Sequence, residues 1–394
     1  MNMFKQVGAV TLMNLKSVPQ RLGTSLVIII GIAGVVGVLV SVLAMSTGMI
    51  KTMENSGRDD RAVILRNGST SETGSVITRD AARLILDSAG VKRDAAGNPV
   101  GSAEALRLLT LFTKGDNMEA NVILRGVGPK LREVRPEFQL TAGRMFTPAV
   151  NEVIIGKAAA RLYKGAGIGD KITTREATWT IVGTFTSGGD SHESELFADA
   201  DTLMSNGRRG AFQSIVVMLE SPGAFQKFKD ALTSNPALAV DVSPEREYFA
   251  QRSKSISRVI SIIAYVVGGI MAVGAIFGAL NTMYSAVSAR LREIATLRAI
   301  GFGATAMVVS VLAEALLLAG IGGVIGAALA WLFFNGHAVS TGGAATGQLI
   351  FELSVSPQLV IVGIVWACVI GLLGGLFPAV RAARLPVATA LRTV

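Results

Sequence analysis

Apolar and polar segments alternate along the chain. Four long apolar segments stand out, at Leu22–Ile50, Val259–Ala289, Ala299–Asn335 and Leu353–Val380. Each exceeds the roughly 20 apolar residues that a helix needs to cross a bilayer. None of them contains a charged residue except the third, which holds Glu314. The pattern predicts four transmembrane helices, over residues 22–50, 259–289, 299–335 and 357–380. The first is too long for a signal peptide and is expected to remain as an anchor.

The first two apolar segments are separated by a polar region, residues 51–258, in which alternation indicates β-strands. Trp179, Ile181 and Phe185 alternate with threonines, so Thr178–Phe185 is predicted to be a half-buried strand. Further strands are predicted at Asn121–Val127, Glu152–Gly156 and Ser214–Glu220. Helices are predicted at Thr78–Ala89, Lys157–Lys164 and Pro222–Thr233, and loops at Asp94–Ser102 and Ser187–Ser194. The expected fold class is a membrane α-helical protein with four transmembrane helices and a large extracytoplasmic α+β domain inserted between helices 1 and 2.

Basic residues predict the orientation in the membrane. Three precede the first span, three follow the second and three follow the last: Lys5, Lys16, Arg21, Arg290, Arg292, Arg298, Arg381, Arg384 and Arg392. Basic loops remain in the cytoplasm. The amphipathic segment 1–21, the loop 290–298 and the tail 381–394 are therefore expected to be cytoplasmic. Residues 51–258 and the short loop 336–356 are expected in the periplasm, in a multi-pass protein of the inner membrane.

Composition supports a membrane protein. Half of the 394 residues are hydrophobic and 16% are charged, whereas soluble domains have about 25% charged residues. The net charge of +9 comes mostly from the predicted cytoplasmic segments, so it indicates a membrane and not nucleic acid.

The loop 290–298 is too short for a domain and too charged for lipid. Leu291, Ile294 and Ala295 follow the spacing of one helical face, and Arg290 lies within reach of Glu293. We predict a short helix that a cytoplasmic partner binds. The alternative is that its arginines only fix the topology by binding lipid headgroups.

Two features of the spans have both a functional and a structural interpretation. Glu314 is either a polar element of a conformational cycle or a carboxyl group hydrogen-bonded to a neighbouring helix. Three glycine pairs with GxxxG spacing predict close helix packing, within one bundle or in a dimer: Gly274 and Gly278, Gly322 and Gly326, Gly371 and Gly375.

Catalytic motifs are not found. The two histidines, His192 and His337, lie in different segments, and the one cysteine, Cys368, lies in an apolar segment. This excludes a disulfide within the chain and a Cys/His zinc site of the usual ligand count. Gly165–Lys171 lacks the spacing of a phosphate-binding loop. We expect no catalytic residues and no metal.

Several motifs together resemble a known family. Ser288–Gly301, followed by Glu314 and Gly320–Gly326, resembles the FtsX/MacB-type ABC transporter permease domain. The segment 377–392 resembles the family's closing motif, although Leu385 stands where Asp or Asn often precedes the proline. Residues 169–172 and 182–185 resemble parts of the MacB-type periplasmic core domain.

The resemblance implies a permease subunit that is not itself an enzyme. It implies that ATP and Mg bind to a separate cytoplasmic ABC ATPase, and that a second permease copy or a homologous permease completes the complex. ATP-driven motion would pass to the periplasmic domain. The resemblance also allows a periplasmic adaptor and an outer-membrane channel as further partners. The implied ATPase-coupling residues are Arg290, Leu291, Arg292, Glu293, Ile294, Leu297 and Arg298.

Three functions stay open within the family. The first is export or extrusion of a substrate from the membrane or periplasm. The others are lipoprotein extraction, as in LolC/LolE-like members, and regulation of a cell-wall hydrolase, as in FtsX-like members. A membrane-anchored receptor or enzyme is a fourth interpretation, which the short charged loop and the lack of catalytic motifs disfavour.

Overall fold

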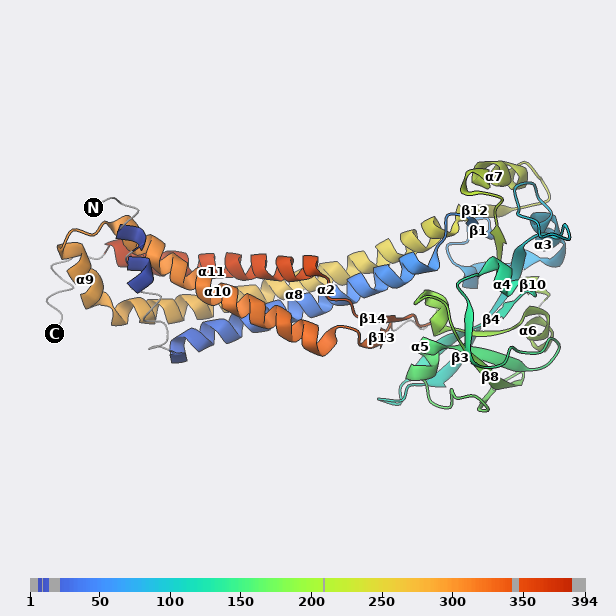
Figure 1. The fold of residues 1–394 in the computed structure, drawn as a ribbon, viewed down its shortest axis with the longest axis horizontal. Helices are drawn as coiled ribbons and strands as arrows, with labels where there is room; N and C mark the ends of the chain where they lie inside the picture. The colour runs from blue at the N-terminus through green and yellow to red at the C-terminus, as the bar shows by residue number, and fades with distance from the viewer. Residues whose placement is uncertain (1–5, 9, 14–21, 208–209, 342–346, 385–394) are drawn as a thin grey trace. The chain divides into compact units, whose positions relative to one another are not determined.

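Figure 1 shows the computed structural model, which describes residues 6–8, 10–13, 22–207, 210–341 and 347–384. Predictions that concern Lys5, Lys16, Arg21, Leu385 and Arg392 lie outside the described residues. The chain forms two compact units. The helical unit comprises the residues up to Gly48, Ser257–His337 and the residues from Leu353 onward. The sheet unit comprises Met49–Ile256 and Ala338–Glu352.

The helical unit is built on four helices that are long and apolar enough to cross a membrane, which confirms the predicted four-helix fold. They are α2 (Leu22–Ser56), α8 (Glu245–Ala289), α10 (Ala304–Phe334) and α11 (Pro357–Arg384). Three of them extend beyond the apolar segments that predict them: α2 to Ser56, α8 back to Glu245 and α11 to Arg384. Helix α8 starts at Glu245 because its first turns contain Glu, Arg, Gln and Lys, which are good helix formers despite their polarity.

Glycine brings α10 and α11 into close contact, and Figure 1 shows the two helices side by side. A Cβ atom built on Gly371 would lie 2.5 Å from the Cβ of Ala319. One built on Gly375 would lie 2.7 Å from the Cβ of Ala315. Both distances are shorter than real Cβ contacts, so any larger side chain at these positions would separate the helices.

The second close contact joins α10 to α2. A Cβ atom on Gly322 would lie 2.8 Å from the carbonyl oxygen of Ile29, and one on Gly326 would lie 2.4 Å from that of Ala33. These backbones touch because neither glycine has a side chain.

The third glycine pair, on α8, differs from the other two. Among the described residues, no atom lies within 4 Å of a Cβ built on Gly274 or Gly278. A packing role for these two glycines therefore stays a prediction.

The loop between α8 and α10 contains the predicted short helix, α9 (Leu291–Ala299). It ends before Gly301, whose φ of 102° is a left-handed conformation that favours glycine. Because of this break, α10 starts at Ala304 and not at 299 as predicted.

The sheet unit contains a mixed ten-stranded sheet, in the order β12-β1-β11-β3-β4-β9-β6-β8-β5 with β7 paired to β8. Most pairs are antiparallel, and β4–β9 and β6–β8 are parallel. The strands are β1 (Arg61–Arg66), β3 (Gly101–Phe112), β4 (Glu119–Val127), β5 (Gln139–Gly143), β6 (Glu152–Gly156), β7 (Lys171–Thr173), β8 (Thr178–Thr186), β9 (Leu196–Asp199), β11 (Ser214–Met218) and β12 (Val240–Pro244).

Two small sheets and several short helices complete the sheet unit. The small sheets pair β2 (Ile77–Thr78) with β10 (Ala211–Phe212) and β13 (Ala338–Ser340) with β14 (Ile350–Glu352). The helices are α3 (Arg79–Leu86), α4 (Leu131–Val134), α5 (Lys157–Leu162), α6 (Ala200–Asn206), α7 (Phe225–Thr233) and the 3-10 helices η2 (Glu72–Gly74), η3 (Ser191–Ser194) and η4 (Pro222–Ala224). The predicted α+β character is confirmed.

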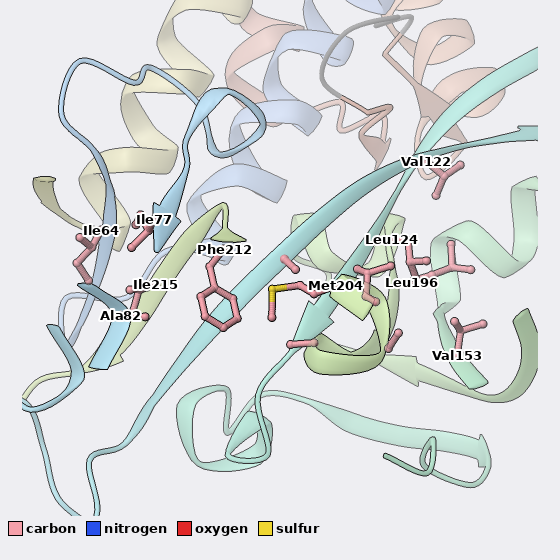
Figure 2. Close-up of a cluster of buried hydrophobic side chains, with 14 of the residues drawn as sticks. Ile64, Ile77, Ala82, Val122, Leu124, Val153, Leu196, Met204, Phe212 and Ile215 are labelled. Atoms are coloured by element: carbon pink, nitrogen blue, oxygen red, sulfur yellow. The ribbon is translucent and has the colours of Figure 1, made fainter. Parts of the chain in front are cut away.

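The core of the sheet unit forms where the apolar faces of the strands meet the short helices. Figure 2 shows part of it, with Val122 and Leu124 of β4, Leu196 of β9 and Met204 of α6 among the buried side chains. Strand β8 has the predicted alternation, with Trp179 and its apolar neighbours buried and the threonines at least partly exposed.

The prediction of a loop over Ser187–Ser194 is wrong in part. Residues 191–194 form η3, and all four of its side chains are buried. The segment is polar because its side chains bind other polar groups inside the unit, and a polar pattern alone does not distinguish this from exposure to solvent.

Candidate functional site

A buried ion pair joins the short loop to the transmembrane helices. Arg290, the residue before α9, donates from Nη1 to Oε2 of Glu314 at 2.9 Å and from Nη2 to Oε1 at 3.2 Å. The two side chains are only 6% and 7% exposed. A bidentate Arg–carboxylate pair is strong and directional, so it fixes the start of α9 against the middle of α10.

This pair changes two predictions from the sequence. Glu314 is hydrogen-bonded as the structural interpretation expects, but its partner comes from the loop that was predicted to bind a cytoplasmic protein. Arg290 pairs with Glu314 and not with Glu293. Apolar side chains surround the pair, among them Val287 and Met307.

The apolar face of α9 is turned toward the core of the helical unit. Ile294 and Ala295 are 7% and 3% exposed and belong to the core of the helical unit. Leu291 and Leu297 are partly buried. Leu291, Ile294 and Ala295 thus share one face as predicted, and through Ile294 this face packs into the apolar core of its own chain. A coupling role for Ile294 stays a prediction.

The opposite face of α9 is exposed. It carries Arg292, Glu293, Thr296 and Ala299, and the next residue, Ile300, is 71% exposed. At the other end of the helix, Arg298 donates from Nη1 to the carbonyl oxygen of Ala383 in α11 at 2.9 Å. Helix α9 is thus bonded to both α10 and α11 and still presents one face outward.

The sheet unit contains a second polar cluster, a buried ion network. At its centre, Arg125 of β4 is 2% exposed. Its guanidinium lies 2.8 Å from Glu72, 2.7 Å from Glu104 and 2.6 Å from Glu195. One arginine therefore binds three carboxylates from separate parts of the chain.

The network extends to the first turn of α8. Arg135 contacts Glu104 at 3.1 Å and Glu245 at 3.3 Å. Arg61 of β1 contacts Glu245 at 2.6 Å and Glu137 at 2.5 Å. Since Glu245 is the first residue of α8, the network attaches the beginning of this helix to the sheet.

Electrostatics keep these groups charged despite their burial. Burial opposes ionisation of Glu72 and Glu104, but the nearby arginine charges outweigh it and lower the pKa of both carboxyls. Burial also disfavours the charge on Arg125, yet its three carboxylate neighbours raise its pKa well above the ordinary value. Glu72, Glu104 and Arg125 thus act as fixed charges at neutral pH. At Glu245, by contrast, burial raises the pKa although Arg61 and Arg135 oppose this shift.

The buried segment around η3 attaches α2 to the same unit. Ser56, the last residue of α2, donates from Oγ to Oγ of Ser191 at 2.9 Å and accepts from the backbone N–H of Ser191 at 2.8 Å. Ser194 exchanges two hydrogen bonds with the backbone of Ile350 in β14.

Asp190 and His192 form a pair that resembles part of a catalytic site, but its geometry is structural. Asp190 accepts from both His192 Nδ1, at 3.0 Å, and Ser187 Oγ, at 2.8 Å. The serine therefore contacts the carboxylate and not the imidazole that would activate it. Both Asp190 and His192 are at most 2% exposed, so substrate cannot reach them. Within the described part of the chain, no group of three or more potential ligands could hold a metal ion.

The ion network has a signal in the sequence that hydrophobic periodicity does not capture, namely charged residues within or beside apolar strands. Glu104 and Arg125 stand inside largely apolar strands, and Arg61 directly precedes the apolar run of β1. A charge inside such a run is rarely buried unless it is paired. Which arginine meets which glutamate depends on the sheet order and is not visible in the sequence.

Both parts of the chain match families of known proteins. Residues 22–235 match the family model of the MacB-like periplasmic core domain, and residues 265–387 match that of the FtsX-like permease C-terminal domain. Among solved structures, the periplasmic region of MacB from Actinobacillus actinomycetemcomitans covers 54% of this chain and 97% of its own, with 13% identity and a TM-score of 0.37.

Curated relatives cover most of the chain. "Macrolide export ATP-binding/permease protein MacB" of Bdellovibrio bacteriovorus is 24% identical over 94% of the chain, and that of Rhodopirellula baltica is 26% identical over 94%. The chain spans 59% of the length of each. Because one of the two family matches covers more than half of the chain, the chain belongs to the MacB-like family, with a MacB-like periplasmic core domain joined to an FtsX-like permease domain.

Proposed function

We propose that this chain is the permease subunit of an ABC transporter in the inner membrane and that it does not itself hydrolyse ATP. A separate cytoplasmic ATPase binds ATP and Mg. Its motion passes through the helical unit to the sheet unit in the periplasm and drives export or extrusion of a substrate. The observation that carries this proposal is the buried Arg290–Glu314 pair, because it bonds a short polar loop to a transmembrane helix.

The contacts of α9 support this role. Arg290 bonds the start of the helix to α10, and Arg298 bonds its end to α11. Ile294 packs into the apolar core between these bonds. A displacement of α9 therefore moves two membrane helices with it, as a coupling element requires.

The ATPase-binding surface in this proposal is the exposed face of α9. It presents charged and polar groups, Arg292, Glu293 and Thr296, and ends at the exposed Ile300. An apolar side chain with a polar surround is a common composition for the centre of a protein interface. The names of the relatives, which include both "ATP-binding" and "permease", support a pairing with an ATPase.

Further partners are part of the same proposal. A second copy of the chain, or a homologous permease, would complete the membrane assembly. A periplasmic adaptor and an outer-membrane channel would continue the export route. The expectation of these partners comes from the family.

The experiment that tests the proposal measures ATP hydrolysis in lipid nanodiscs. The chain alone should show none above background, and adding the ATPase that copurifies with it should produce transport-linked hydrolysis. Glu314→Gln retains hydrogen bonding and should have a mild effect, whereas Glu314→Leu leaves Arg290 buried and unpaired and should reduce the coupled activity. Hydrolysis by the isolated chain would overturn the proposal. If Leu is tolerated and Gln is not, the charge of Glu314 acts in ion or proton coupling instead.

A further inference from the structure

A short helical segment near the start of the chain lies against the turn between α9 and α10. Residues 6–8 and 10–13 are helical, and we call them the N-terminal segment. Figure 1 shows the segment in dark blue, beside the start of α10. Gln6 accepts at Oε1 a hydrogen bond of 3.3 Å from the backbone N–H of Gly303. Since Gly303 directly precedes α10, this bond attaches the segment to the end of the short loop.

Val10 is the residue through which the N-terminal segment enters the core of the helical unit. It is 2% exposed and belongs to the same buried cluster as Ile294 of α9 and Met307 of α10. Leu12, in contrast, is 57% exposed. The segment therefore has one face against the helical unit and another face open, as an amphipathic helix does.

The inner face of the N-terminal segment borders the ion pair between Arg290 and Glu314. Val10 and Met13 line a small cavity together with these two charged residues. The volume of the cavity is about 20 Å³, which is room for about one water molecule. The segment thus forms part of the wall that separates the pair from solvent.

The ion pair has a hydrogen-bonding position to which water can bind. Nη1 and Nη2 of Arg290 donate to Glu314. Nε of Arg290 is also buried, and it has no hydrogen-bond partner within the ranges that the structure describes. A buried donor of this kind binds water wherever the surroundings admit it. Hydration of the pair would therefore begin at Nε, from the cavity that Val10 and Met13 help to enclose.

We propose that the N-terminal segment is a removable cover that controls the access of water to the Arg290–Glu314 pair. With the cover in place, the two charges attract each other in apolar surroundings, where such attraction is strong. When the segment moves away, water reaches Nε and the attraction weakens toward that of an exposed pair. Helix α9 is then held less firmly to α10. Only the further step, that the ATPase cycle opens this cover, rests on the proposed function.

Thiol labelling measures whether water reaches the cavity. Met307 lines the cavity and is 2% exposed, so Met307→Cys places a single thiol there in the full chain with Cys368→Ala. The reagent is trimethylammonioethyl methanethiosulfonate, whose permanent charge restricts it to water, and no ATPase is present. Val10→Ser should raise the rate of modification at least about tenfold, because the burial of valine favours the closed position by roughly this factor or more. Leu12→Ser, at an exposed position, should leave the rate unchanged.

A double-mutant cycle of Arg290→Met and Glu314→Leu measures the strength of the pair itself. In the Leu12→Ser chain, the coupling between the two residues should equal that in the unmodified chain. In the Val10→Ser chain, the coupling should fall by a factor of at least about ten, toward the weak coupling of exposed pairs. Val10→Ala leaves a gap in the cover and should act in the same direction to a smaller degree. It replaces Val10→Ser in both measurements if that chain does not fold.

Two results would overturn the proposal. One is an equal rate of modification in the Val10→Ser and Leu12→Ser chains, and the other is coupling between Arg290 and Glu314 that Val10→Ser leaves unchanged. Because both measurements are made without ATPase, neither result depends on whether an ATPase binds α9. Conversely, ATP hydrolysis by the isolated chain would overturn the proposed function and leave the role of the N-terminal segment intact.

Discussion

At the scale of single residues, buried arginines connect segments that are distant in sequence through ion pairs. Arg290 pairs with Glu314 in the helical unit, and Arg61, Arg125 and Arg135 form such pairs in the sheet unit. A buried ion pair adds little net stability over an apolar replacement, but breaking one leaves a charge without a partner. Its value here lies in fixing the geometry between elements that are distant in sequence.

A double-mutant cycle tests the ion pair between Arg290 and Glu314 in the helical unit. Arg290→Met or Glu314→Leu alone should lower the free energy of unfolding by about 3–5 kcal/mol, because each leaves one buried charge unpaired. The double variant should lose clearly less than the sum of the two. Denaturation of the full chain in detergent gives these values.

The control cycle uses the surface pair Arg79–Asp201, whose side chains are 49% and 71% exposed. Exposed pairs contribute about 0–1 kcal/mol, so this cycle should show weak coupling. Strict additivity at Arg290 and Glu314 would contradict the assigned contact.

The Asp190–His192 pair predicts an unusual response to acid. Burial raises the pKa of Asp190 to about 6, against a hydrogen bond from Ser187. Burial and the charge of Arg135 lower the pKa of His192 to about 3. As pH falls below the ordinary histidine pKa, His192 takes up a proton only in the unfolded chain, so stability is lost. Between pH 6 and about 4, Asp190 takes up a proton in the folded chain, which offsets this loss.

Asp190→Asn removes the carboxyl group whose protonation in the folded chain offsets the loss of stability. Its melting temperature, followed by circular dichroism, should fall more steeply than that of the unmodified chain between pH 6 and 4. The exposed substitution Asp230→Asn on α7 should leave the slope unchanged. If Asp190→Asn and the unmodified chain have parallel pH profiles, the opposing titrations are excluded.

At the scale of elements, the apolar segments predict the membrane helices well, because a span must be apolar along its whole length. The polar start of α8 and the strand β3 are harder to predict. Helix α8 continues into residues with no hydropathy signal, and β3 carries Glu104 at a buried position that interrupts the apolar alternation. The sequence predicts the apolar face of α9 but not that the core of its own helical unit covers this face, since an apolar stripe does not say whether its cover comes from the same chain or another.

Glycine packing gives a prediction with an internal control. Gly326→Ala should destabilise the helical unit although alanine is the better helix former by about 1 kcal/mol, because the new Cβ would lie 2.4 Å from the carbonyl oxygen of Ala33. Gly274→Ala, whose Cβ meets no described atom within 4 Å, should be neutral or slightly stabilising. Thermal unfolding in detergent measures both. Equal effects at the two positions would contradict the close α2–α10 contact.

At the scale of the whole molecule, two continuous helices contribute residues to both units. Helix α2 ends at Ser56, which is bonded to Ser191, and α8 begins at Glu245, which is bonded to Arg61 and Arg135. The charge pattern predicts that the sheet unit lies outside the cytoplasm. The family relationship supports a periplasmic location of the sheet unit. The contacts of Ser56 and Glu245 depend on the folded chain and could not be predicted from the sequence.

Cysteine labelling tests the orientation. Cys368 is the one cysteine of the chain, so Cys368→Ala gives a background without thiols. Lys171→Cys, on the exposed strand β7, should react with a membrane-impermeant maleimide added to the periplasmic side. Ser288→Cys, just before the short loop, should react only after the membrane is opened. The reverse pattern would show that the orientation is inverted.

Cross-linking shows whether an ATPase binds this chain through the exposed face of α9. In the Cys368→Ala background, single cysteines replace Thr296 on the exposed face and Ile294 on the buried face, and a short bifunctional maleimide is added to the complex with the copurifying ATPase. We expect a cross-link to the ATPase from Thr296→Cys and none from Ile294→Cys. A cross-link from Ile294→Cys without one from Thr296→Cys, or none from either in an intact complex, would contradict binding through this face.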